Sequence, residues 1–83
     1  MNLTERDEGE FKIYAGAMEG ACGDGYIAAV VVSRVRGVSR PREVFRDDSL
    51  ACGHRWAKAE EAIGYALGKA REVIHTEQYR LAA

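Results

Sequence analysis

The chain has 83 residues, of which 47% are hydrophobic and 30% charged, and its formal net charge at pH 7 is −1. This length suits one domain near the lower limit at which a hydrophobic core suffices, so self-association is expected on size alone. The nearly balanced charge excludes a strong overall attraction to nucleic acid or to a membrane surface. No run of about eighteen apolar residues could cross a bilayer, and the polar start lacks the apolar core of a secretory signal. With only two cysteines, the protein is expected to be cytoplasmic, with reduced thiols.

The first third of the chain carries a strand pattern that ends in a glycine-rich turn. Residues 1–9 are polar and charged apart from one leucine, and we expect them to form a flexible N-terminal segment. From residue 11 to 18 apolar positions alternate with the others, which predicts a first strand. The glycines and the aspartate of residues 20–25 supply the backbone freedom of a hairpin turn.

The middle of the chain predicts two further strands. Residues 26–36 are rich in β-branched side chains, and their first half is apolar on both faces, which favours a central place in the sheet. Residues 37–41 turn the chain, and residues 42–47 predict a third, shorter strand around Val44 and Phe45. Because the connections are short, the three strands are expected to form an antiparallel meander.

Residues 58–75 have the period of an amphipathic helix, and no other segment has a comparable one. We therefore predict an α+β domain over residues 10–75: a three-stranded antiparallel β-meander with one long C-terminal helix packed on one face. Residues 76–83 contain no Gly or Pro, so the helix is able to extend into this tail. Residues 50–57 show no clear pattern, and no residue that commonly caps a helix immediately precedes Lys58. The predicted apolar face comprises Ala59, Ala62, Ile63, Ala66, Leu67, Ala70, Val73 and Ile74.

Two glycines are the least expected residues of this helix. Gly64 and Gly68 fall on its outward face, and each costs up to about 1 kcal/mol relative to alanine in a helix interior. Small residues four apart let a second helix approach closely, so Gly64, Tyr65 and Gly68 are candidates for self-association. The alternative is that the protein simply tolerates two poor helix formers.

Basic residues gather in the middle of the chain. Residues 34–58 hold seven Lys or Arg against three Asp or Glu, a local excess of +4. Guanidinium groups pair with phosphates, so an arginine ribbon on the second and third strands could bind anions or nucleic acid. The alternatives are a solvated, charged sheet edge, or pairing with the acidic N-terminal part of the chain. The candidate contacts are Arg34, Arg36, Arg40, Arg42 and Arg46.

Other motifs do not indicate catalysis, a metal or a cofactor. The GxxG of residues 20–25 joins two predicted strands, whereas the nucleic-acid clamp of KH domains joins helices. The residues Cys22, Cys52, His54 and His75 lack the paired spacing of zinc ligands. A nucleophile pair of Cys52 with His54 has no visible third group to orient the histidine.

The predicted order is three strands followed by a helix, and the entry to that helix, Trp56–Ala62, ends in a Glu-Glu-Ala step. This arrangement resembles small bacterial domains of the HicB-like antitoxin family. The order is also similar to the β-β-β-α part of double-stranded-RNA-binding domains. The first resemblance implies a partner protein, although no DNA-binding segment follows the helix. The second implies RNA binding, but Glu60 and Glu61 stand where that family places phosphate-contacting lysines, and no helix precedes the first strand. No functional residue is carried over from either family.

The sequence therefore predicts a non-enzymatic interaction domain that self-associates. Its expected partner is a second copy, as a homodimer, or another protein, and not a membrane. The alternative is a domain that binds nucleic acid weakly through the arginine ribbon.

Overall fold

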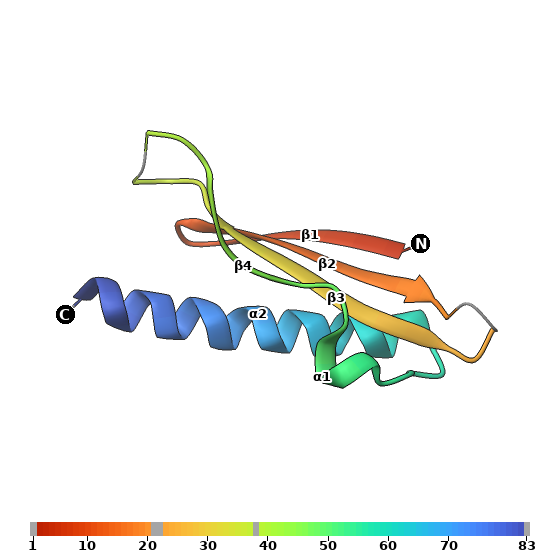
Figure 1. Cartoon of the computed structure of the whole chain (residues 1–83). Helices are drawn as coiled ribbons and strands as arrows, with labels where there is room; N and C mark the ends of the chain where they lie inside the picture. The colour runs from red at the N-terminus through yellow and green to blue at the C-terminus, as the bar shows by residue number, and fades with distance from the viewer. Residues whose placement is uncertain (1, 21–22, 38, 83) are drawn as a thin grey trace.

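The computed structural model describes residues 2–20, 23–37 and 39–82, with the side chains of residues 81 and 82 left out. It is an α+β fold in which four antiparallel strands form one sheet in the order β1-β2-β3-β4, and a long helix crosses one face (Figure 1). The strands are β1 (Asn2–Glu8), β2 (Phe11–Glu19), β3 (Tyr26–Arg34) and β4 (Arg42–Asp47), and the helices are α1 (Leu50–Gly53) and α2 (Ala59–Ala82).

The predicted number of three strands is wrong, because residues 2–8 form a fourth one. These residues, which the sequence assigns to a flexible end, pair with β2 from Asn2↔Ala17 to Glu8↔Phe11. β1 escapes a search for apolar alternation because it is an edge strand and most of its side chains are exposed. Its best sequence signal is Gly9, which has a φ of 58° in the two-residue connection between β1 and β2.

The core lies between the sheet and α2, as the two periodicities predict. Alternate residues of β2 and β3 are buried from Phe11 to Ala17 and from Ala28 to Val32, with exposed fractions of 1% or less. Five of the thirteen apolar residues that are buried in the described chain lie on α2. Three of these five are alanines, and their small side chains let the helix pack close to the strands. These helix residues are Ala62, Ala66, Leu67, Ala70 and Ile74.

The segment between β4 and α2 is tied back to the start of β3. Tyr26 and Trp56 exchange backbone hydrogen bonds, with N···O distances of 2.8 and 2.9 Å. Gly25 precedes this bridge with a φ of 112°, and a Cβ there would lie 2.6 Å from the carbonyl oxygen of Trp56. Only glycine therefore fits beside the bridge.

Between β4 and this bridge the chain makes a short left-handed turn. Leu50 is buried, while Ala51 and Cys52 have φ angles of 53° and 58°, followed by Gly53 at 81°. Left-handed backbone costs an L-residue roughly 1–2 kcal/mol, because its Cβ crowds the following carbonyl oxygen. The turn is therefore a local source of strain held by the burial of Leu50.

α2 begins at Ala59, and its N-terminal group is satisfied from within the helix. The backbone N–H of Lys58 donates to Oε1 of Glu61 at 3.1 Å, which is half of a capping box. The helix continues past His75 to Ala82, so most of the tail at residues 76–83 does extend it. Across the described ranges, no helix is both long and apolar enough to span a bilayer.

Candidate interaction surfaces

The outward face of α2 is open at both of its glycines. Ideal Cβ atoms on Gly64 and Gly68 would meet no other atom within 4 Å. A hollow of about 340 Å³ lies over this strip, and its wall also includes Tyr65, Lys69 and Glu72. The sequence prediction thus placed Gly64, Tyr65 and Gly68 together on one surface, and the structure has them there.

An aromatic cluster adjoins this glycine strip. The rings of Trp56 and Tyr65 are 4.9 Å apart between centroids, and the ring of His54 lies 4.5 Å from that of Trp56, edge to face. Tyr65 is 44% exposed. Aromatic side chains at a surface often anchor partners. The position of Trp56 at the start of the helix is expected from the sequence, but its stacking with Tyr65 and His54 is not, because it also depends on the bridge that fixes Trp56 on β3.

At its other end the glycine strip runs toward β4. A second hollow, of about 200 Å³, is lined by Val44, Phe45 and Val73 among others, and it shares Lys69 and Glu72 with the first. The ammonium of Lys69 lies 3.5 Å from the Glu72 carboxylate and 5.9 Å from the centre of the Phe45 ring. The charged side chains of Lys69 and Glu72 therefore lie between the two hollows.

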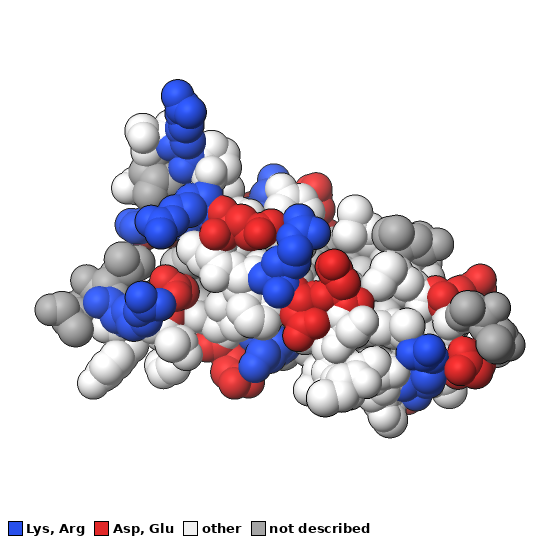
Figure 2. All heavy atoms as spheres, viewed as in Figure 1, with Lys and Arg blue, Asp and Glu red and all other residues white. Residues whose placement is uncertain are grey.

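The predicted arginine ribbon is divided in two by the fold. Arg34 and Arg42 face each other across β3 and β4, and Arg36 and Arg40 lie exposed in the connection between these strands. This β3–β4 hairpin projects beyond the sheet, and Figure 2 shows Lys and Arg side chains gathered over it. Within the described ranges, Arg36, Arg40 and Arg42 have no acidic partner.

Arg34 is held in place by the neighbouring β1–β2 connection. Its guanidinium donates to Oε2 of Glu10 at 2.9 Å, and the Glu10 carbonyl accepts from the backbone N–H groups of Val35 and Arg36. The hairpin is therefore anchored at its base by both the main chain and the side chain of Glu10. Three of the four hairpin arginines remain free to meet an anion.

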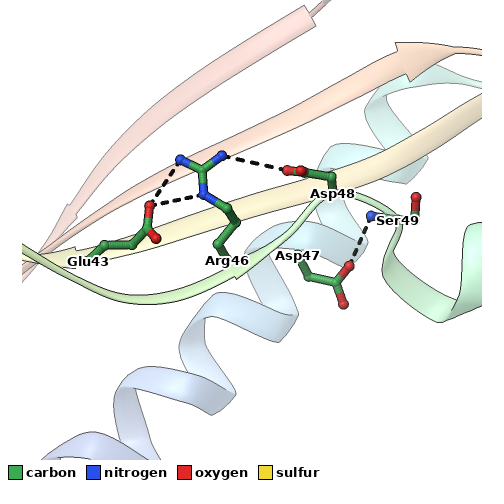
Figure 3. A network of polar contacts seen from close by, with 5 residues as sticks. All are labelled: Glu43, Arg46, Asp47, Asp48 and Ser49. Atoms are coloured by element: carbon green, nitrogen blue, oxygen red, sulfur yellow. Dashed lines mark hydrogen bonds and ion pairs between the residues drawn. The ribbon is translucent and has the colours of Figure 1, made fainter.

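Arg46 is placed apart from the hairpin and is already paired. It lies 3.0 Å from Glu43 and 3.9 Å from Asp48, on the outer side of β4 (Figure 3). The hydrogen bond to Glu43, and then the charges of Glu43 and Asp48, raise the pKa of the Arg46 guanidinium. For this residue a charged sheet edge is the better description, so Arg46 does not belong with the other four.

The face of the sheet opposite α2 is a surface that sequence reasoning did not single out. Figure 1 shows α2 on one side of the sheet and no helix on the other. On this outer face the alternate residues of β2 and β3 from Tyr14 to Met18 and from Ile27 to Val31 are apolar, and all are half-buried except Gly16, which is buried beside Leu3 of β1. The apolar outer-face residues are Leu3, Tyr14, Gly16, Met18, Ile27, Ala29 and Val31.

The remaining motifs form no reactive constellation in the parts that the structure describes. β2 and β3 pair as an antiparallel hairpin, and at its end the Gly20 N–H donates to the Gly25 carbonyl. Cys22 lies outside the described residues, while Cys52 is exposed and His54 packs on Trp56. The described part of the chain contains no group of three His, Cys, Asp or Glu side chains arranged to hold a metal.

A wide hollow of about 620 Å³ lies between the start of β1 and the first turn of α2. Its wall includes Thr4, Tyr26, Lys58 and Glu60. These side chains come from β1, β3, α2 and the segment just before α2, and no hydrogen bond joins any two of them in the described structure. The hollow is a surface depression with polar walls.

Comparisons with protein-family models, curated proteins and solved structures found no match. The resemblance to HicB-like or double-stranded-RNA-binding domains therefore stays a prediction.

Proposed function

We propose that this chain is a non-enzymatic interaction domain that self-associates. The observation that carries the proposal is that only one face of the sheet is covered. α2 packs on that face, while the other face presents apolar residues of β2, from Tyr14 to Met18, and of β3, from Ile27 to Val31. An antiparallel sheet commonly leaves one face to solvent, but that face is then polar, whereas this outer face is apolar along β2 and β3. In a chain of this size, a second copy is an available source of that cover.

The size of the core points the same way. Its largest fully buried side chains are five apolar residues, and alanines fill much of the rest. Burial yields about 25 cal/mol per Å² of apolar surface, so alanines contribute little each. Further burial between copies would add to a modest intramolecular core.

Sedimentation velocity over a range of protein concentrations tests the proposal. We expect the weight-average sedimentation coefficient to rise from the value for a monomer toward that for a dimer between low micromolar and millimolar protein. A coefficient that stays at the monomer value throughout would overturn self-association as the function.

A second candidate function is weak nucleic-acid binding by the β3–β4 hairpin. The observation that favours it is that Arg36, Arg40 and Arg42 are exposed without an acidic partner among the described residues. Contacts of guanidinium groups with phosphates are independent of base sequence and strongly dependent on salt. The hairpin has no exposed aromatic residue on which a base could stack, so backbone contact is the expected mode.

A further inference from the structure

We propose that the outer face of the sheet docks on the same face of a second copy, giving two sheets packed face to face with the helices outside. This inference rests on the proposed self-association and names the surface that performs it. The partner is thus a second copy of this chain, and the contact is a sandwich of two four-stranded sheets.

Large and small side chains alternate on the outer face, as the packing of two sheets requires. Three cross-strand pairs occupy its centre: Tyr14↔Val31, Gly16↔Ala29 and Met18↔Ile27. The middle pair is small, and the two flanking pairs are bulky. Packed sheets interdigitate their side chains at a spacing of about 10 Å, so a partner's bulky side chain can enter above the small pair.

β1 lies beside the small pair, and Gly16 is buried next to it. A Cβ on Gly16 would lie 3.8 Å from Cδ1 of Leu3 and 3.4 Å from the Asn2 carbonyl oxygen. Leu3 is 62% exposed, the largest exposed fraction of any apolar side chain on the described part of the sheet. Leu3 therefore adds exposed apolar surface beside the small pair, which a second copy could cover.

Charge favours a second copy over a charged partner. The centre of the face carries no ionised side chain. At its rim Lys12 lies 4.0 Å from Glu5, and Arg46 is paired with Glu43. Asp7, opposite Lys12 on β1, belongs to the same rim, which therefore holds three acids and two bases, Glu5, Asp7 and Glu43 against Lys12 and Arg46. Because the rim carries both signs and the centre is uncharged, two copies can meet with opposite charges facing each other at the rim.

The available area suits a weak dimer. β2 and β3 have nine residues each, but β1 has seven and β4 six, so the face is on average about 26 Å long and, at four strands, about 19 Å wide. Two copies would bury roughly 1,000 Å² in total, just below the usual range for a specific interface. A weak, concentration-dependent dimer is therefore expected.

The other surfaces fit a second copy less well. The glycine strip around Gly64 offers little apolar area and has the Lys69–Glu72 ion pair beside it. The free edge of β1 carries Arg6 between Glu5 and Asp7, a pattern that discourages strand-to-strand pairing of like chains. Among the surfaces of the described residues, the outer face offers the larger apolar area, with an uncharged centre.

Val31→Arg tests the proposal, because it puts a charge at the centre of the face. Ser33→Arg is the matched control, since it adds the same charge two residues further along the same strand and face, at the rim. We expect Val31→Arg to raise the dimer dissociation constant at least about thirtyfold, as unpaired charges in interfaces do. Ser33→Arg should change it by less than about threefold. If far-UV circular dichroism shows that Val31→Arg is unfolded, Val31→Thr replaces it, with a smaller rise expected in the same direction.

Gly64→Arg separates this inference from the proposed function. Loss of the dimer in Val31→Arg and its retention in Gly64→Arg would support sheet-to-sheet docking. Loss in Gly64→Arg with retention in folded Val31→Arg or Val31→Thr would overturn it, while self-association stands. A wild-type chain that is monomeric at millimolar concentration would overturn both.

Discussion

Oε1 of Glu61 accepts a hydrogen bond from the backbone N–H of Lys58 at 3.1 Å, and so the first turn of α2 is closed by a residue three positions inside it. This bond is the half of a capping box in which the acid inside the helix accepts from the backbone before it. The neighbouring Glu60 lies in the same first turn, where its charge suits the positive end of the helix dipole. The two glutamates can therefore be told apart by experiment.

We predict that Glu61→Ala lowers the free energy of unfolding by about 1 kcal/mol, because it leaves an N–H group of the helix start without its partner. Glu60→Ala is the matched control, since it removes an equal charge from the same turn but no hydrogen bond, and it should cost less than half as much. Urea unfolding followed by circular dichroism measures both. Equal losses of unfolding free energy would mean that both glutamates stabilise the helix through its dipole, and that the Glu61 hydrogen bond contributes little.

We predict that Ala51→Gly raises the free energy of unfolding by about 1 kcal/mol, since glycine adopts the φ of 53° without the strain that alanine pays. Ala57→Gly is the control, because Ala57 is also exposed but has no positive φ. It should be neutral or destabilising, as glycine only adds entropy to the unfolded chain. Thermal and urea denaturation compare the two, and a stabilising Ala57→Gly would contradict the explanation by strain.

We predict that Gly64→Ala stabilises the monomer by about 1 kcal/mol, because the added Cβ meets nothing within 4 Å and alanine is the better helix former. Gly25→Ala provides the contrast, as its Cβ would lie 2.6 Å from the Trp56 carbonyl oxygen and should lower stability. Both are measured by urea unfolding at low micromolar protein. A destabilising Gly64→Ala would show that the glycine serves a contact within the folded chain.

We predict that the double variant Arg36→Glu with Arg40→Glu abolishes any retention of duplex DNA at low ionic strength. If three hairpin arginines contact phosphates, the logarithm of the association constant should fall with that of the salt concentration with a slope of about −2.7. Fluorescence anisotropy with a labelled duplex at several salt concentrations measures the slope.

Arg46→Gln is the control for the DNA experiment, because Arg46 is engaged by Glu43 and Asp48 and should contribute nothing to the slope. An Arg46→Gln variant that loses binding as fully as the double variant would show that the hairpin is not the site. Absence of wild-type binding at low salt would remove nucleic-acid binding as a function.

Much of the fold follows from side-chain periodicity alone. β2, β3 and α2 are predicted because Phe11, Val30 and Ala66 each belong to a set of apolar residues spaced as one face of a strand or of a helix requires. The central place of β3 in the sheet is confirmed. β1 could not be found in this way, since its hydrogen bonds to β2, and not buried side chains, place it in the sheet. The count of strands depended on that one polar segment.

Some of the candidate surfaces can likewise be predicted from side-chain periodicity, and others depend on how the strands pair. Gly64 and Gly68 are predictable as outward residues, because a helix fixes the directions of its side chains. The separation of Arg46 from Arg34 is not, since it depends on a register shift between β3 and β4 at Val32/Ser33 and on acids near β4. The bare outer face could not be foreseen either, because residues apolar on both sides of β3 do not reveal which side the helix leaves open.

The bridge between Tyr26 and Trp56 also closes a long loop, because it joins the start of β3 to the segment that leads into α2. That loop contains β3, β4 and the left-handed turn, and the entropy lost in closing it is offset only by contacts that form within it. We therefore expect the entry of α2 to be fixed on the sheet only after β3 and β4 have paired, which φ-values of variants in the bridge and in the strands would test.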